Sequence, residues 1–102
     1  MLWYMAKLAA EEVRRRIAGL SGWRLDGEVI SRQFTFAGFP DAIAFVTRLG
    51  FAAEAADHHP DMVINYKRVT VSYSTHSEGG LTDKDFEGAR SATEIAATAG
   101  GK

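Results

Sequence analysis

The strongest constraint on the fold of this chain is a pair of predicted β-hairpins built from alternating residues. In the first hairpin, Asp26-Gly27 is a turn signal, because a type I′ turn needs positive φ at both central residues. The strand that follows has one apolar face and one polar face, made of Ile30, Phe34 and Phe36 against Ser31, Gln33 and Thr35. We therefore expect this hairpin to bury one face and leave the other in water.

The second predicted hairpin covers residues 62–76. Met62, Ile64 and Tyr66 alternate with Val63 and Asn65, and Lys67-Arg68 is the predicted turn. In the strand that follows, the apolar face consists of Val69, Val71 and Tyr73, and the opposite face of Thr70, Ser72, Ser74 and His76. If the alternation holds, His76 stands at the polar end of a strand.

A segment with helical periodicity precedes each of these hairpins. Residues 7–18 carry an apolar stripe at four-residue spacing, and we expect Gly19 to end that helix in the left-handed conformation. A second helix is predicted from Pro40, which suits a first helical turn, to about Asp57. Pro60 disfavours helical geometry at the preceding residue and so places the break at residue 59. Gly50 costs about 1 kcal/mol in a helix interior relative to Ala, so we interpret it as a close packing contact.

A third helix is predicted after residue 82. Residues 82–85, TDKD, have the form of a capping box in which Asp85 replaces the usual Glu. An apolar helical face follows, formed by Phe86, Ala89, Ala92, Ile95 and Ala96. The order α-ββ-α-ββ-α predicts an α+β fold in which the helices cover one face of a four-stranded antiparallel sheet.

The chain has 102 residues, which makes residues 1–102 a single domain. We expect residues 1–6 and 98–102 to be poorly ordered. The formal net charge of -1 gives no reason to expect a nucleic-acid partner, and the lack of cysteine excludes disulfides, thiolate catalysis and zinc–cysteine sites. No apolar run approaches the roughly 20 residues that cross a bilayer, and the short apolar start lacks a signal-peptide cleavage pattern. We therefore expect a cytoplasmic protein without a membrane partner.

All three histidines of the chain, His58, His59 and His76, lie between Glu54 and Asp85. Histidine has an unperturbed pKa of about 6.5, so it exchanges protons near neutral pH. Three interpretations are open, namely acid–base catalysis, a metal site and purely structural roles. A metal site is the weakest of these, because consecutive residues of an extended chain point apart and catalytic zinc usually takes three converging ligands.

The residues around the histidines also have alternative interpretations. Glu54 precedes His58 by four residues, so the two could face each other across the last helical turn; otherwise Glu54 is a solvated helix residue. Asp85 serves as a capping carboxylate, as part of a site, or as both. Trp23 is either a packing residue or a ring that flanks a flat ligand, and Tyr66 is a packing residue of the hairpin rather than a proton donor.

Written out, the spacing is Glu54, three residues, His58-His59-Pro60, five residues, Tyr66, nine residues, His76, eight residues and Asp85. This order resembles the signature of the pterin-4a-carbinolamine dehydratases, and the similarity extends from residue 22 to about residue 97. The resemblance implies the same α+β sandwich. It also implies a homodimer or homotetramer that forms through sheet edges and helices.

The resemblance further implies an activity and its residues. The substrate would be 4a-hydroxytetrahydropterin, left when an aromatic amino acid hydroxylase turns over, and loss of water would give quinonoid dihydropterin without a metal or other cofactor. His58 and His76 would be the acid–base pair and His59 mainly a binding group, supported by Glu54 and Asp85. The remaining pterin contacts implied are Asp57, Ser74, Thr75 and Ser77. Trp23 is a further candidate contact because its ring could flank a flat ligand.

Two other roles stay open at this point. Some members of the family resemble coactivators that bind the dimerisation helices of a homeodomain transcription factor, so an interaction module is the alternative from another class. A role in another pterin pathway, such as molybdopterin metabolism, is also open.

Overall fold

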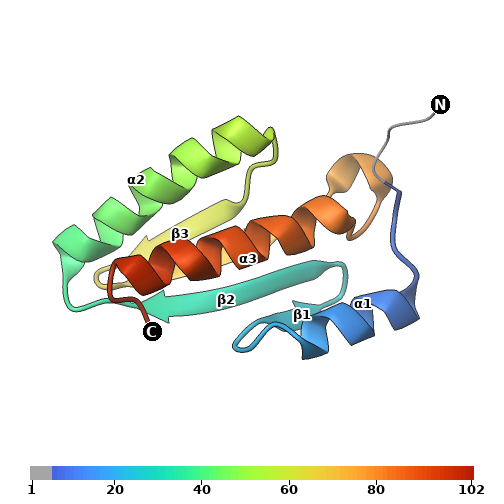
Figure 1. Cartoon of the computed structure of the whole chain (residues 1–102), viewed down its shortest axis with the longest axis horizontal. Coiled ribbons are helices and arrows are strands. Elements are labelled where there is room, and N and C mark those ends of the chain that lie inside the picture. The colour runs from blue at the N-terminus through green and yellow to red at the C-terminus, as the bar shows by residue number, and fades with distance from the viewer. Residues whose placement is uncertain (1–5) are drawn as a thin grey trace.

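A computed structural model describes residues 6–102, and within that range the fold is α+β with three α-helices and a four-stranded antiparallel sheet (Figure 1). The elements are α1 (Ala10–Ala18), β1 (Arg24–Asp26), β2 (Val29–Thr35), α2 (Phe39–Ala56), β3 (Asp61–Asn65), β4 (Arg68–Tyr73), the short 3₁₀ helix η1 (His76–Glu78) and α3 (Asp83–Thr98). The predicted order of helices and strands is confirmed. Residues 1–5, most of the N-terminal stretch expected to be poorly ordered, lie outside the described residues.

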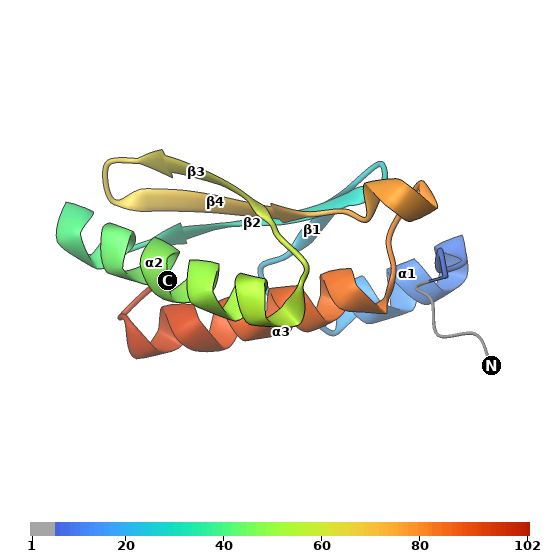
Figure 2. The ribbon, with the colours of Figure 1, turned by 90° about the horizontal axis from the view of Figure 1, so that it is seen from above.

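The sheet has the strand order β1-β2-β4-β3, so the two hairpins lie side by side with β2 and β4 in the centre. Ile30 of β2 pairs with Tyr73 of β4, and Phe34 pairs with Val69. The three helices lie on one side of the sheet (Figure 2). This arrangement gives the apolar faces of both hairpins a common partner layer, as the alternation predicts.

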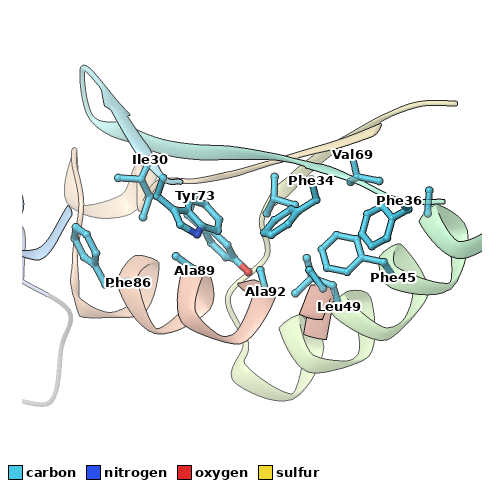
Figure 3. Packing of buried hydrophobic residues seen from close by; sticks show 14 of the residues in the cluster. Ile30, Phe34, Phe36, Phe45, Leu49, Val69, Tyr73, Phe86, Ala89 and Ala92 are labelled. Atoms are coloured by element: carbon cyan, nitrogen blue, oxygen red, sulfur yellow. The ribbon is translucent and has the colours of Figure 1, made fainter. Parts of the chain in front are cut away.

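The core lies between this sheet face and the helices (Figure 3). Its fully buried members include Ile30, Phe34, Val69 and Val71 from the sheet, Phe45 and Leu49 from α2, and Phe86, Ala89 and Ala92 from α3. The α3 face consists largely of small residues, which lets the helix lie close to the sheet. At Gly88 a Cβ atom would stand only 2.4 Å from the Tyr73 ring, so this glycine makes the room that the ring occupies.

Both hairpin turns lie one residue away from their predicted positions. Asp26 pairs with Val29, so the central residues of the first turn are Gly27 and Glu28, and only Gly27 has positive φ, at 62°. In the second turn Asn65 pairs with Arg68, which makes Tyr66 and Lys67 central. Strand register follows the side chains that must be buried as well as local turn preference, and here burial decides.

The predicted ends of α1 and α2 also need correction. α1 begins at Ala10 instead of residue 7, because the backbone N–H of Leu8 donates to the carbonyl of Leu81 at 2.8 Å and keeps that segment extended. Gly19 is right-handed (φ -88°) and not left-handed as predicted. α2 ends before Asp57, which is left-handed (φ 53°), so the break precedes the predicted one at residue 59.

Two further positions differ from expectation. A Cβ atom added at Gly50 would meet no neighbouring group of residues 6–102 within 4 Å, so the interpretation of this glycine as a close packing contact is wrong within this chain. At the C-terminus, expected to be poorly ordered, the N–H of Gly101 donates to Ala96 at 2.7 Å and that of Lys102 donates to Thr35 at 2.8 Å. These bonds hold the tail beside the end of β2.

The two interior glycines of α2 and α3 make a matched test of this packing. Gly88→Ala should destabilise the protein by about 1–3 kcal/mol, because the added methyl group overlaps the Tyr73 ring. Gly50→Ala should stabilise it by about 1 kcal/mol, because the site is open and Ala is the better helix former. Urea unfolding of both variants measures the difference. Equal effects of the same sign would contradict the packing described here.

Candidate active site

The loop after α2 sets the directions of the first two histidines. The N–H of His58 donates to the carbonyl of Ala53 at 3.1 Å, and that of Asp57 donates to Glu54 at 3.1 Å. With Asp57 in the left-handed conformation, this is a Schellman motif, which ends a helix and reverses the chain. Asp57 therefore acts as a backbone hinge, and the two residues after it leave the helix in extended geometry.

Each of these two histidines forms a pair with a different carboxylate. His58 Nε2 lies 2.6 Å from Asp85 Oδ1, and His59 Nε2 lies 2.8 Å from Glu54 Oε1. The predicted pairing of Glu54 with His58 is therefore wrong. The hinge at Asp57 ends the helical spacing on which it depended, and the two rings point apart, as expected for consecutive residues of an extended chain.

The two pairs lie in opposite environments. The side chain of His58 is 11% exposed and that of Asp85 is fully buried, whereas the side chain of His59 is 58% exposed and Glu54 is solvated. A close ion pair or hydrogen bond is strong when water is excluded and weak when it is exposed. The His58–Asp85 pair is thus the one that can fix a ring in place.

Asp85 is held by three donors at once. Its Oδ2 atom accepts hydrogen bonds from the hydroxyl of Thr75 at 2.7 Å and from the backbone N–H of Thr82 at 2.9 Å. The second of these bonds belongs to the predicted capping box, which is confirmed. Because an ionised carboxylate only accepts hydrogen bonds, His58 donates to it through Nε2–H, which leaves Nδ1 as the ring nitrogen that Asp85 does not engage. Asp85 therefore both caps α3 and orients His58.

Tyr73 forms the wall against which His58 rests. The two rings are nearly parallel, with an interplanar angle of 13° and centroids 6.0 Å apart. Burial, and then the negative charge of Asp85, raise the pKa of Tyr73 to about 12. The phenol therefore keeps its proton at neutral pH and serves as a packing surface beside His58.

Two small cavities have Tyr73 in their lining. A cleft of about 100 Å³ at the end of the sheet, here called the sheet-end cleft, is lined by Val29, His59, Asp61, Ser72, Tyr73, Ser74 and His76. A pocket of about 70 Å³ between α2 and α3, the interhelical pocket, is lined by residues that include His58, Tyr73, Lys84, Glu87 and Ser91. The structure thus brings His59 and His76 together in one cleft and places His58 in the interhelical pocket.

The other residues expected at a pterin site are divided between surface and interior. Ser74 lines the sheet-end cleft and donates to the carbonyl of Glu28 at 2.8 Å, while Ser77 is exposed on η1 and does not line that cleft. Trp23 is buried, and its Nε1–H donates to Thr93 at 2.9 Å. This placement agrees with the packing interpretation of Trp23 and not with a ring that flanks a ligand.

Sequence patterns give no indication that Tyr73 and Thr82 belong to the site around His58. The alternation assigns Tyr73 to the apolar strand face alone, and Thr82 belongs to a helix cap, yet both contact the group around Asp85 or His58. A threonine before a capping carboxylate is an ordinary cap signal, so only the fold shows that this cap and the histidine share one carboxylate.

Among residues 6–102, no group of three or more His, Asp or Glu side chains could hold a metal ion. No helix in the same range is long and apolar enough to span a membrane.

The two His–carboxylate pairs provide a controlled comparison. Asp85→Asn should destabilise the protein by about 3 kcal/mol, because an amide replaces one buried acceptor atom with a donor. Glu54→Gln is the matched control and should change stability little, because its pair is solvated. Thermal or urea unfolding at neutral pH measures both. An Asp85→Asn protein as stable as Glu54→Gln would show that the buried pair does not organise this region.

Comparison with known proteins gives consistent matches over most of the chain. The sequence profile of the pterin 4 alpha carbinolamine dehydratase family matches residues 6–95. A protein of Roseiflexus sp. strain RS-1, provisionally named pterin-4-alpha-carbinolamine dehydratase, is 46% identical over 89 residues, which are 87% of this chain and 96% of the relative. A protein of Sulfolobus acidocaldarius with the same provisional name is 39% identical, with 87% and 98% covered.

A solved structure agrees with the fold as well as the sequence. The crystal structure of a transcriptional coactivator/pterin dehydratase from Brucella melitensis superimposes with a TM-score of 0.84 at 39% sequence identity. The match covers 88% of this chain and 98% of that one.

Proposed function

The chain belongs to the pterin 4 alpha carbinolamine dehydratase family, and on that premise we propose that it converts 4a-hydroxytetrahydropterin into quinonoid dihydropterin and water. The observation that carries the proposal is the grouping of all three histidines around the end of β4. Two of them line the sheet-end cleft, and the third is fixed by a buried carboxylate next to it.

The chemistry needs two proton transfers. The bond from C4a to the hydroxyl oxygen breaks with its electron pair on oxygen, and a proton delivered to that oxygen makes water the leaving group. A proton leaves the adjacent ring nitrogen, and its bonding pair forms the new carbon–nitrogen double bond. Imidazoles titrate near neutral pH and are suited to both steps, each typically worth about 10²–10⁴-fold.

We propose His58 and His76 as the acid–base pair and His59 as mainly a binding group. His76 lines the cleft at the start of η1, where its exposed ring can meet a ligand. His58 has a defined proton-exchanging nitrogen because Asp85 engages its Nε2. Since His58 borders the interhelical pocket and not the sheet-end cleft, its participation requires the pterin ring to approach that pocket as well.

The three histidines should separate in steady-state kinetics with 4a-hydroxytetrahydropterin. His58→Ala and His76→Ala should each lower kcat by roughly 10-fold or more, because each removes a general acid–base group. His59→Ala should mainly raise KM, because a group that only holds the ligand contributes equally to ground and transition states. Both 4a-hydroxy stereoisomers should be assayed, since two acids on different sides could each serve one.

A metal control belongs with that experiment. Treatment with a chelator should leave kcat of the wild-type protein unchanged, because the proposed steps use imidazoles alone. Wild-type kcat in all three histidine variants, or activity that is lost on chelation and restored by zinc, would refute the assignment.

We also propose that the protein is a homodimer or homotetramer. Helix α2 carries three exposed apolar side chains: Phe51 is 77% exposed, and Phe39 and Ile43 are also exposed. β3 is an edge strand with an exposed Val63. Apolar patches and open strand edges of this kind mark surfaces for association.

Charged substitutions should distinguish these two surfaces. Phe51→Lys should reduce the mass measured by light scattering if the α2 face is an interface, because burying the ammonium group opposes association. Val63→Lys tests the sheet edge in the same way. Neither residue lines the cavities near the histidines, so activity of the separated subunits can be measured independently. An 11 kDa species for the wild-type protein at micromolar concentration would contradict oligomerisation.

The wider role that we propose is tetrahydropterin recycling in the cytoplasm, linked to an aromatic amino acid hydroxylase. A role in molybdopterin-linked metabolism is the alternative within pterin chemistry. The Brucella protein is described as a transcriptional coactivator as well as a pterin dehydratase. We prefer the dehydratase proposal for this chain because its three histidines suit the proton transfers of that reaction.

A further inference from the structure

We propose that Thr75 is a positioning residue that fixes His58 and His76 in one arrangement, an inference that rests on the proposed function. Thr75 lies just beyond the end of β4 and directly precedes His76 in the sequence. Its side chain is hydrogen bonded to the carboxylate that orients His58, and its backbone holds the turn that carries His76. One residue therefore supports two histidines that lie on different cavities.

The side-chain half of this support is a directed ring of hydrogen bonds. Thr75 Oγ1 donates to Asp85 Oδ2 at 2.7 Å and lies 2.9 Å from the hydroxyl oxygen of Thr82. Because the single proton of the Thr75 hydroxyl goes to the carboxylate, the Thr82 hydroxyl is the donor between the two threonines. Thr82 in turn accepts from the backbone N–H of Asp85 in the capping box. The ring closes on Asp85, whose other oxygen meets His58.

The backbone half of the support holds the His76 turn at both ends. The N–H of Thr75 donates to the carbonyl of Gly80 at 3.2 Å, and the N–H of Gly80 donates back at 3.3 Å. The N–H of Glu78 also donates to the carbonyl of Thr75, at 3.1 Å. The 3₁₀ turn that begins at His76 is thus closed upon Thr75, and rotation or displacement of this residue moves the His76 ring.

The side chain of Thr75, one of the pterin contacts that the resemblance implies, is engaged inside the protein. Thr75 is 3% exposed, and its hydroxyl already donates to Asp85 and accepts from Thr82. It does not line the sheet-end cleft, although both of its neighbours in the sequence do. Its influence on substrate is therefore indirect, through the two histidines.

The test compares Thr75→Val, which keeps the shape and removes the hydroxyl, with Thr75→Ser, which keeps the hydroxyl. Thr75→Val should lower kcat by about tenfold or more with a much smaller change in KM, because loss of orientation weakens the transition state more than binding. Thr75→Ser should restore kcat to within about threefold of the wild type, since the ring of hydrogen bonds can form again.

Nuclear magnetic resonance supplies a readout that does not need activity. The Nε2–H proton of His58, hydrogen bonded to a buried carboxylate, should give a downfield signal in the wild type and in Thr75→Ser. In Thr75→Val that signal should shift or broaden by exchange. Because loss of the bond to Asp85 also releases residue 75, on whose backbone the His76 turn closes, the ring signals of His76 should change as well. A change confined to His58 would overturn the inference that one residue supports both histidines.

Thr93→Val is the matched control for loss of a hydrogen-bonded threonine hydroxyl, here a partly buried one. Thr93 accepts from Trp23 Nε1 and donates to the carbonyl of Ala89, each at 2.9 Å, and it lines neither cavity at the histidines. This variant should lose stability but keep kcat and the histidine signals. Wild-type kcat in Thr75→Val, or an equal loss of kcat in Thr93→Val, would overturn the proposal. If the wild-type protein has no dehydratase activity, the proposed function fails, and the histidine signals still decide the role of Thr75.

Discussion

The buried carboxylate of Asp85 is the interaction on which the local structure depends. It joins three separate segments, because its donors come from the loop after α2, from the segment that follows β4 and from the start of α3. A carboxylate buried without partners would cost several kcal/mol. Each of the three segments is therefore held to a narrow range of positions, and the His58–Asp85 pair beside α3 is fixed with them.

The position of this carboxylate depends on the close packing of α3 against the sheet. The buried face of α3 consists largely of alanines and Gly88, which have no large side chains, and Tyr73 fits into the space that Gly88 leaves. The ring of Tyr73 then stacks against His58, and residue 73 is also part of the lining of the sheet-end cleft. A larger residue on α3 would push the helix, its capping box and Asp85 away from β4. The geometry around the histidines is therefore a consequence of ordinary core packing.

Periodic patterns predicted the part of this structure that depends on burial. The alternation ending at Tyr73 and the helical stripe beginning at Phe86 gave the strands, the helix and the face on which they meet. The pairing of Glu54 with His58 failed because it assumed a helix that continues to residue 58. Asp57 can adopt the left-handed conformation that usually favours glycine or asparagine, so the helix ended earlier than its composition suggests. The role of Thr75 had no periodic signal, because it depends on contacts between segments distant in the sequence.

The orientations of the adjacent histidines have different physical origins. The Glu54 pair is solvated, and such pairs typically contribute no more than about 1 kcal/mol, so Glu54 does little to fix the His59 ring. Pro60 restricts the backbone of His59 to extended geometry, and the hinge at Asp57 sets the direction in which that extended segment leaves α2. His59 is thus placed by its backbone and keeps a solvated ring, which suits a group that adapts to a ligand. His58 is placed by its side chain, through a carboxylate that cannot move without disturbing α3, and this suits a group that must meet a reacting atom at one fixed position.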